Sequence, residues 1–215
     1  MHARTVGTLA AIVAALTLAF GVQAASARTF NWSNQQFRIT WRELKFFDQG
    51  FAEFVALCPV TMEGSFHSRT IAKVVESLIG YITRAAVSEA LCRDPAGGAA
   101  EARFLPETLP WHIRYAGFQG TLPNITRIRV RILRVAYEDV IRGTPCLFSG
   151  LTTPINAEFF REAFGVITAF EFEAATTLPA AAGNCVGLAI RGGLERISTT
   201  FTLLNSTTRI TVTLI

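Results

Sequence analysis

The sequence predicts an all-β protein, an antiparallel sandwich or barrel of about 8–10 strands. Apolar and polar residues alternate with a period of two in several long segments, which places neighbouring side chains on opposite faces of a strand. Turn-rich joints at residues 94–100, 120–124 and 179–184 separate these segments. Hydrophobic residues make up 50% of the 215 residues, which is enough for a substantial core and argues against disorder.

The expected strands account for most of the chain after residue 36. They cover residues 37–47, 59–67, 79–91, 111–118, 127–137, 164–173 and 186–190, with a hairpin over 201–214. In the segment 127–137, arginines at 127, 129 and 131 interleave with isoleucine and valine, and the apolar phase then shifts by one residue. Such a shift predicts a β-bulge near Ile132 and Leu133.

Two later segments also carry an apolar face. In the first, the residues that share a face are Phe164, Val166, Thr168, Phe170 and Phe172, with Glu171 and Glu173 opposite. In the second, Phe201 and Leu203 precede a turn at residues 205–207, and Ile210, Val212 and Leu214 follow it. This second pattern predicts the C-terminal hairpin.

Residues 70–77 are the expected exception to the β pattern. Apolar residues from Ile71 to Leu78 recur at helical spacing, and Ser68 or Thr70 could cap the start of a helix. The residues that follow are rich in β-branched and aromatic side chains, which favour a strand. The sequence therefore predicts one short helix over about residues 70–77 and then a strand over 79–91.

The first 27 residues have the pattern of a cleavable export signal. A short start with one cation, Arg4, precedes an apolar core, and Ala25-Ser26-Ala27 fits the small-x-small pattern that a signal peptidase accepts. The apolar run ends at Val22 and is shorter than the roughly 20 residues that a membrane-spanning helix needs. We therefore expect residues 1–27 to be a signal peptide, and residues 28–215 to be a single β-domain that is secreted, extracellular and without a membrane span.

All four cysteines lie in the part expected to be exported, where an even number predicts two disulfides. We expect Cys58 to pair with Cys92 and Cys146 with Cys185, because each pair brackets one out-and-back excursion of strand-like sequence. The spacing alone does not choose among the possible pairings. A metal site would need ligands close in sequence, such as a Cys-x-x-Cys pair, and the chain has none.

Four segments resemble a group of secreted actinobacterial β-rich proteins. They are Cys58–Ser68 (CPVTMEGSFHS), Leu78–Ala85 (LIGYITRA), Leu109–Tyr115 (LPWHIRY) and Ile210–Ile215 (ITVTLI). The likeness covers most of the chain after residue 27. The resemblance implies an exported β-rich domain, and it carries over no activity, ligand or site.

A candidate binding site lies on the polar faces of two expected strands. Alternation places Glu63, His67 and Arg69 on one face of the first strand, and His112 and Arg114 on one face of the second. If these faces converge, two histidines lie beside a carboxylate and two arginines, a set that suits an anionic ligand or acid–base chemistry. The alternative is that both are ordinary outward faces of antiparallel strands.

Other functional signatures are weak in this chain. It contains no nucleophile elbow, phosphate loop, zinc helix or calcium loop, and we expect no metal or cofactor. Without Arg4, the 20 basic residues become 19 against 16 acidic ones, and no long basic run indicates nucleic-acid binding. The row Arg127, Arg129 and Arg131 could contact a polyanion, but such a row is more typical of a solvated sheet face.

These observations favour a non-enzymatic exported domain with a binding or structural role at or outside the cell surface, where its ligand or partner is not identified by the sequence. One alternative is a carrier of a small apolar ligand, held in a barrel interior lined by some of the 17 phenylalanines. Another is a hydrolase that uses His67 or His112 with Glu63.

Overall fold

A computed structural model of the protein describes residues 29–48, 54–141, 143–172, 177–183, 185 and 191–215. The strands in these ranges are β1 (Thr29–Trp32), β2 (Gln36–Asp48), β3 (Phe54–Phe66), β4 (Thr70–Ala72), β5 (Leu78–Val87), β6 (Ala102–Phe104), β7 (Trp111–Thr121), β8 (Asn124–Leu133), β9 (Ala136–Ile141), β10 (Thr144–Ser149), β11 (Ile155–Arg161), β12 (Ile167–Phe172), β13 (Thr177–Gly183), β14 (Arg191–Leu203) and β15 (Val212–Leu214). Three single-turn 3-10 helices accompany them: η1 (Glu89–Leu91), η2 (Pro106–Thr108) and η3 (Ala163–Gly165). The predicted all-β fold is confirmed. The signal peptide expected over 1–27 and the strand expected over 186–190 lie outside the described residues.

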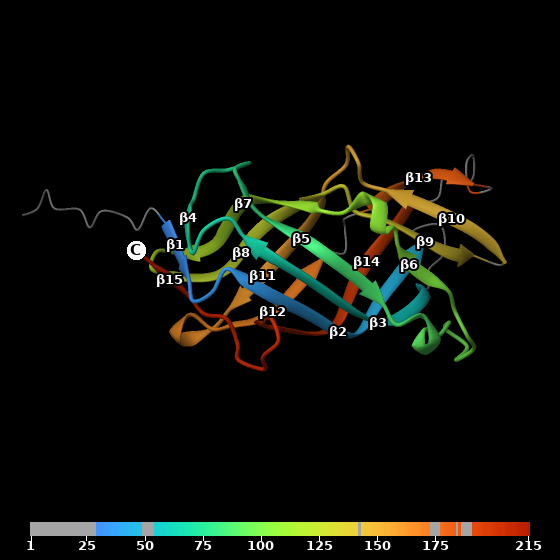
Figure 1. The fold of residues 1–215 in the computed structure, drawn as a ribbon, viewed down its shortest axis with the longest axis horizontal. Coiled ribbons are helices and arrows are strands. Elements are labelled where there is room, and N and C mark those ends of the chain that lie inside the picture. The colour runs from blue at the N-terminus through green and yellow to red at the C-terminus, as the bar shows by residue number, and fades with distance from the viewer. Residues whose placement is uncertain (1–28, 49–53, 142, 173–176, 184, 186–190) are drawn as a thin grey trace, which may run out of the picture.

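Eight antiparallel strands form a nearly closed barrel (Figure 1). They are hydrogen-bonded in the order β12-β11-β8-β7-β5-β3-β2-β14, and β12 packs back against β14. The alternation in β8 follows the prediction, since Ile128, Val130 and Ile132 are buried while Arg129 and Arg131 are exposed. A strand with one apolar face and one charged face stabilises a sheet that curls around a core.

The same sheet continues beyond β14 into β13-β10-β9-β6, at the opposite end of the molecule from β1 and β15 (Figure 1). Strand β14 belongs to both parts, because its first residues pair with β13 and with the far end of β2, and its later residues pair with the start of β2. Strand β2 bends between them at a register shift between Trp41 and Leu44. A bulge of this kind bends the strand and increases its local twist, so that its two halves run in different directions.

A separate three-stranded sheet, β15-β1-β4, lies at the other end of the barrel (Figure 1). Its residue Trp32 is fully buried, and the Trp32 ring centroid lies 4.2 Å from that of Phe66 and 5.3 Å from that of Phe159. The sheet also joins distant parts of the chain, because the backbone N–H of Thr29 donates to the carbonyl of Ile215 at 3.1 Å. We call β15-β1-β4 the end sheet.

Aromatic rings fill the described interior. In the barrel, Phe37 packs on Phe201 with ring centroids 5.4 Å apart, and Trp41 stacks on Phe172 at 5.5 Å. In the second part of the sheet, Tyr137 contacts Phe46 at 5.3 Å and Phe148 at 5.1 Å. Such pairs contribute about 0.5–1.5 kcal/mol each beyond the apolar area that they bury.

Both predicted disulfides are present. Cys58 in β3 is bonded to Cys92 after η1, and Cys146 in β10 is bonded to Cys185, close after β13. Since β10 and β13 are paired neighbours and β3 pairs with β5, each bridge closes a local β-unit as the sequence predicts. Among the described residues, no helix is both long and apolar enough to cross a membrane.

The helix predicted over residues 70–77 is wrong. Residues 70–72 form β4, and residues 73–77 form a turn in which Glu76 has a φ of 65°. Val74 and Val75 belong to the helical spacing, but their side chains are 60% and 59% exposed, so a helix here would bury little apolar surface. Pairing of Ile71 with Phe30 in the end sheet decides the local structure instead. The strand expected over 79–91 is β5, which ends at Val87 before η1.

Other boundaries also differ from the prediction. No bulge joins Ile132 to Leu133, because β8 ends at Leu133, Arg134 adopts a left-handed φ of 71°, and β9 begins as a separate strand. Phe164 does not belong to β12 but lies in η3, where it is 95% exposed. The joint expected over 179–184 is largely strand β13.

The C-terminal hairpin is only partly formed. The turn is present, with Thr202 and Arg209 in an isolated bridge across it. Strand β15 then leaves β14 and pairs with β1, so that Val212 lies opposite Trp32. The pairing partner is thus the first strand, which sequence periodicity does not reveal.

Candidate functional site

The two predicted polar faces do converge, with Tyr81 of β5 between them. Strand β5 is hydrogen-bonded to β3 on one side and to β7 on the other, and Tyr81 lies directly opposite His112. The Tyr81 ring centroid lies 4.8 Å from that of His67 and 5.2 Å from that of His112, both edge-to-face. The two histidines are therefore brought into one row by a residue that the sequence did not single out.

Positive charge gathers at the His112 end of this row. The pKa of His112 is lowered from 6.5, first by burial and then by the positive charges of Arg134, Arg114 and, when protonated, His67. Arg134 reaches this position because His112 pairs with Leu133 and the chain turns at the left-handed residue that follows. We call His67, Tyr81, His112, Arg114 and Arg134 the imidazole cluster.

Three members of the imidazole cluster have no counter-ion in the part of the chain that the structure describes. Among the described residues, the side chains of His67, His112 and Arg134 make no hydrogen bond or ion pair with protein groups. Arg114 is the partial exception, because its Nη1 lies 3.9 Å from a Glu76 carboxylate oxygen, and Arg131 binds the same carboxylate. The Nε of Arg114 is buried without a hydrogen-bond partner.

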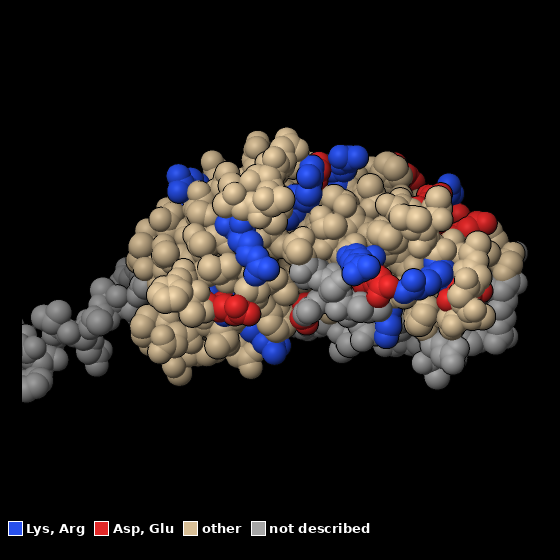
Figure 2. Space-filling view, turned by 90° about the horizontal axis from the view of Figure 1, so that it is seen from below, with Lys and Arg blue, Asp and Glu red and all other residues tan. Residues whose placement is uncertain are grey.

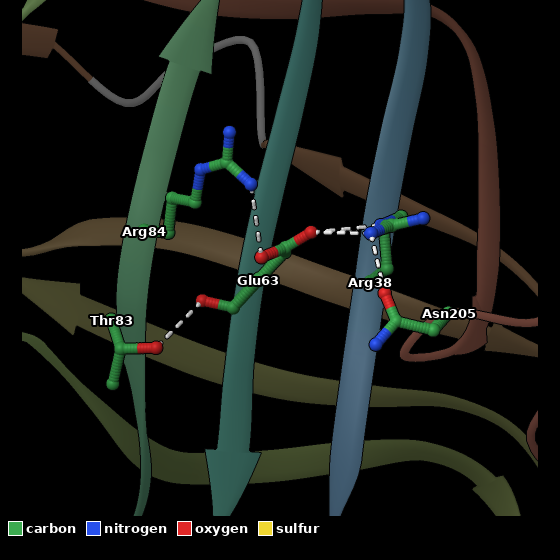
Figure 3. A network of polar contacts seen from close by, with 5 residues as sticks. All are labelled: Arg38, Glu63, Thr83, Arg84 and Asn205. Atoms are coloured by element: carbon green, nitrogen blue, oxygen red, sulfur yellow. Dashed lines mark hydrogen bonds and ion pairs between the residues drawn. The ribbon is translucent and has the colours of Figure 1, made fainter.

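Glu63 belongs to a different network (Figure 3). One carboxylate oxygen accepts hydrogen bonds from Arg38 at 2.9 and 2.6 Å, and the other lies 3.4 Å from Arg84. Arg38 also donates to the side chain of Asn205 at 3.1 Å, which links β2 to the C-terminal turn. Glu63 and His67 are four residues apart on one strand face, or about 13 Å. No hydrogen bond joins Glu63 to either histidine among the described residues.

Arg69 also lies outside the imidazole cluster. Its Nε donates to the carbonyl oxygen of Trp32 at 3.1 Å. This bond holds the end of β1 against the segment that leads into β4. The role of Arg69 in the structure is to fix the end sheet, and the predicted five-residue site is therefore divided among three places.

The arginine row of β8 is largely occupied by neighbouring groups. Arg127 pairs with Glu158 at 2.6 Å, Arg129 donates to the carbonyl of Phe118 at 3.4 Å, and Arg131 binds Glu76. On the face shown in Figure 2, basic and acidic side chains are interspersed rather than gathered into one stripe. This distribution is that of a solvated sheet face.

Sequence reasoning missed Tyr81 and Arg134. Alternation along β5 could have placed Tyr81 on the polar face, since its neighbours Gly80 and Ile82 are buried. The sequence pattern gives no indication that Arg134 lies near His112, because the position of Arg134 depends on its left-handed backbone conformation between β8 and β9. Within the described ranges, no three His, Cys, Asp or Glu side chains are arranged to hold a metal ion.

Comparison of the chain with protein-family models, with curated proteins and with solved structures finds no match.

Proposed function

We propose that the protein is an exported domain that binds an anionic group of a ligand at or outside the cell surface through the imidazole cluster. The observation that carries the proposal is that His67 and His112 lie on either side of Tyr81 and that Arg134 adds positive charge beside His112. Within the part of the chain that the structure describes, none of these three side chains has an acidic partner. The guanidinium groups that lower the pKa of His112 create a positive potential beside it. Such a potential favours an anion at this position, and a bound anion in turn stabilises the protonated imidazole.

The chemistry of the cluster supports an oxyanion in particular. The guanidinium of Arg134 offers several N–H donors, and each protonated imidazole adds donors to the same row. Charge-assisted hydrogen bonds of this kind are roughly twice as strong as neutral ones. Tyr81 supplies a rigid surface between the two histidines, so that little side-chain freedom is lost when the ligand binds.

The two disulfides and the all-β fold are compatible with an extracellular binding or structural role. The barrel-carrier alternative is not supported by the described interior, because buried rings such as Trp32, Phe37 and Phe159 occupy it. The hydrolase alternative required a histidine within hydrogen-bond reach of Glu63. Glu63 instead binds Arg38 and Arg84.

The test follows the imidazole protons by NMR, with inorganic phosphate as the probe. Phosphate should raise the pKa of His112 in the wild type, because an anion stabilises the charged imidazole. Arg134→Gln should weaken phosphate binding by about tenfold, since it removes a charge-assisted hydrogen bond. Arg103→Gln is the matched control, because Arg103 is an exposed arginine that pairs with Glu138 on β9.

Two results would contradict the proposal. One is an identical His112 titration with and without phosphate. The other is an equal loss of phosphate affinity in Arg134→Gln and in Arg103→Gln, because that would mean that phosphate responds to net charge alone.

A further inference from the structure

A hollow of about 700 Å³ opens where β2 bulges, and it is separate from the imidazole cluster. Apolar lining is provided by Leu57, Pro59 and Leu91, with Trp41 and Thr40 beside them. Leu91 is 67% exposed, although it is a leucine next to a disulfide. A volume of this size lies within the range of about 300–1,000 Å³ that is typical of small-molecule sites.

The sequence explains why a hollow forms at this point. Trp41 of β2 lies opposite Val60 of β3, and Leu44 lies opposite Cys58. Two residues of β2 therefore face the single residue Pro59, which has no N–H to donate to the ladder. Arg42 and Glu43 are the two residues displaced at this bulge, and both line the hollow.

The wall formed by residues 91–93 is fixed at three points. The Cys58–Cys92 disulfide bonds it to β3. Leu57 and Arg93 exchange backbone hydrogen bonds of 2.8 and 3.0 Å, and the Arg93 side chain forms an ion pair with Glu43, which also lines the hollow. A site whose walls are already fixed loses little conformational freedom on binding.

Charge identifies the kind of ligand that fits. The Arg93–Glu43 pair is internally neutral, whereas Arg42 is exposed and makes no hydrogen bond or ion pair among the described residues. The hollow thus offers one uncompensated guanidinium beside apolar side chains that a ligand could cover. We propose that it binds a small organic anion with an apolar body, the carboxylate on Arg42 and the chain or ring against Leu57, Pro59 and Leu91.

The test compares octanoate with octan-1-ol by NMR titration of the protein. Octanoate should shift the methyl signals of Leu57 and Leu91 and the side-chain signal of Arg42. It should bind about tenfold more tightly than the alcohol, because only the acid forms a charge-assisted hydrogen bond. Arg42→Gln should remove that preference for the acid over the alcohol.

Variants at exposed positions keep the test independent of folding. Leu91→Ser should weaken both ligands several-fold, whereas Leu151→Ser, at a leucine that is 57% exposed elsewhere, should change neither. His112→Gln should also leave octanoate binding unchanged, which separates this site from the imidazole cluster. The inference is overturned if octanoate leaves these signals unmoved, or if Arg42→Gln and Leu91→Ser bind both ligands as the wild type does.

Discussion

The close approach of β3 and β5 at Gly64 gives the sharpest test of the fold, through the substitution Gly64→Ala. An ideal Cβ on Gly64 would lie 2.2 Å from the carbonyl oxygen of Tyr81 and 2.6 Å from Cζ of Phe37. Ordinary contact begins at 3.4 Å, so the two strands would have to separate by about 1.2 Å. The oxygen belongs to the backbone and cannot rotate away as a flexible side chain would.

The expected cost follows from that separation. Overpacking of a filled core costs typically about 1–3 kcal/mol. Ladder hydrogen bonds on both sides of Gly64 would weaken as well, at roughly 1 kcal/mol net for each bond lost. We therefore expect Gly64→Ala to lower the free energy of unfolding by about 3 kcal/mol, a large part of the roughly 5–15 kcal/mol that stabilises a domain.

The assay is urea denaturation followed by tryptophan fluorescence, with both disulfides intact. The matched control is Gly98→Ala, where the nearest atom to an added Cβ is a carboxylate oxygen of the half-buried Asp94, at 2.9 Å. That side chain can move, so the control should stay within about 1 kcal/mol of the wild type. A Gly64→Ala variant as stable as the wild type would refute the strand separation on which the reasoning rests.

Three more predictions concern the cross-links, the site and the N-terminus. Replacing Cys58 and Cys92 with serine opens a loop of 34 residues. It should lower the free energy of unfolding by about 4 kcal/mol, measurable in the same urea titration. Because the folded state lowers the pKa of His112 below 6.5, the unfolded state binds the proton more readily, and stability falls as the pH drops below 6.5. His112→Gln should remove this part of the acid loss, seen as a smaller drop in denaturation midpoint between neutral and mildly acidic pH than in the wild type. N-terminal sequencing of protein from the medium should begin at or near Arg28, and full-length protein in the membrane fraction would contradict the signal peptide.

The fold was predictable where one face of a strand is buried and the other is charged. In β8 the arginines and the β-branched residues alternate without a break, and periodicity alone then fixes which side chains face the core. Periodicity failed at residues 70–77, where Ile71 is held by its pairing with Phe30 rather than by its neighbours in sequence. Pairing between distant strands overrides a local helical spacing when the helix would bury little apolar surface.

The site was predictable only in part, for a related reason. Alternation correctly placed His67 and His112 on polar faces, but strand order is needed to know that Tyr81 lies between them. The ion-pair partner of Glu63 could not be predicted for the same reason. Arg38 is 25 residues away in sequence and lies beside Glu63 only because of the register of β2 with β3.

The end sheet bears on when the chain can fold. The first described strand, β1, is hydrogen-bonded on one side to β15, and the bonded residues Thr29 and Ile215 are 186 positions apart. During synthesis this edge of β1 therefore has no partner until residues 212–214 have emerged, because Val212 is the residue that lies opposite Trp32. Non-local pairings of this kind slow folding. The barrel strands, by contrast, end at Leu203, so their partners are all synthesised before β15. The end sheet is therefore the part of the described fold whose pairing must wait longest during synthesis.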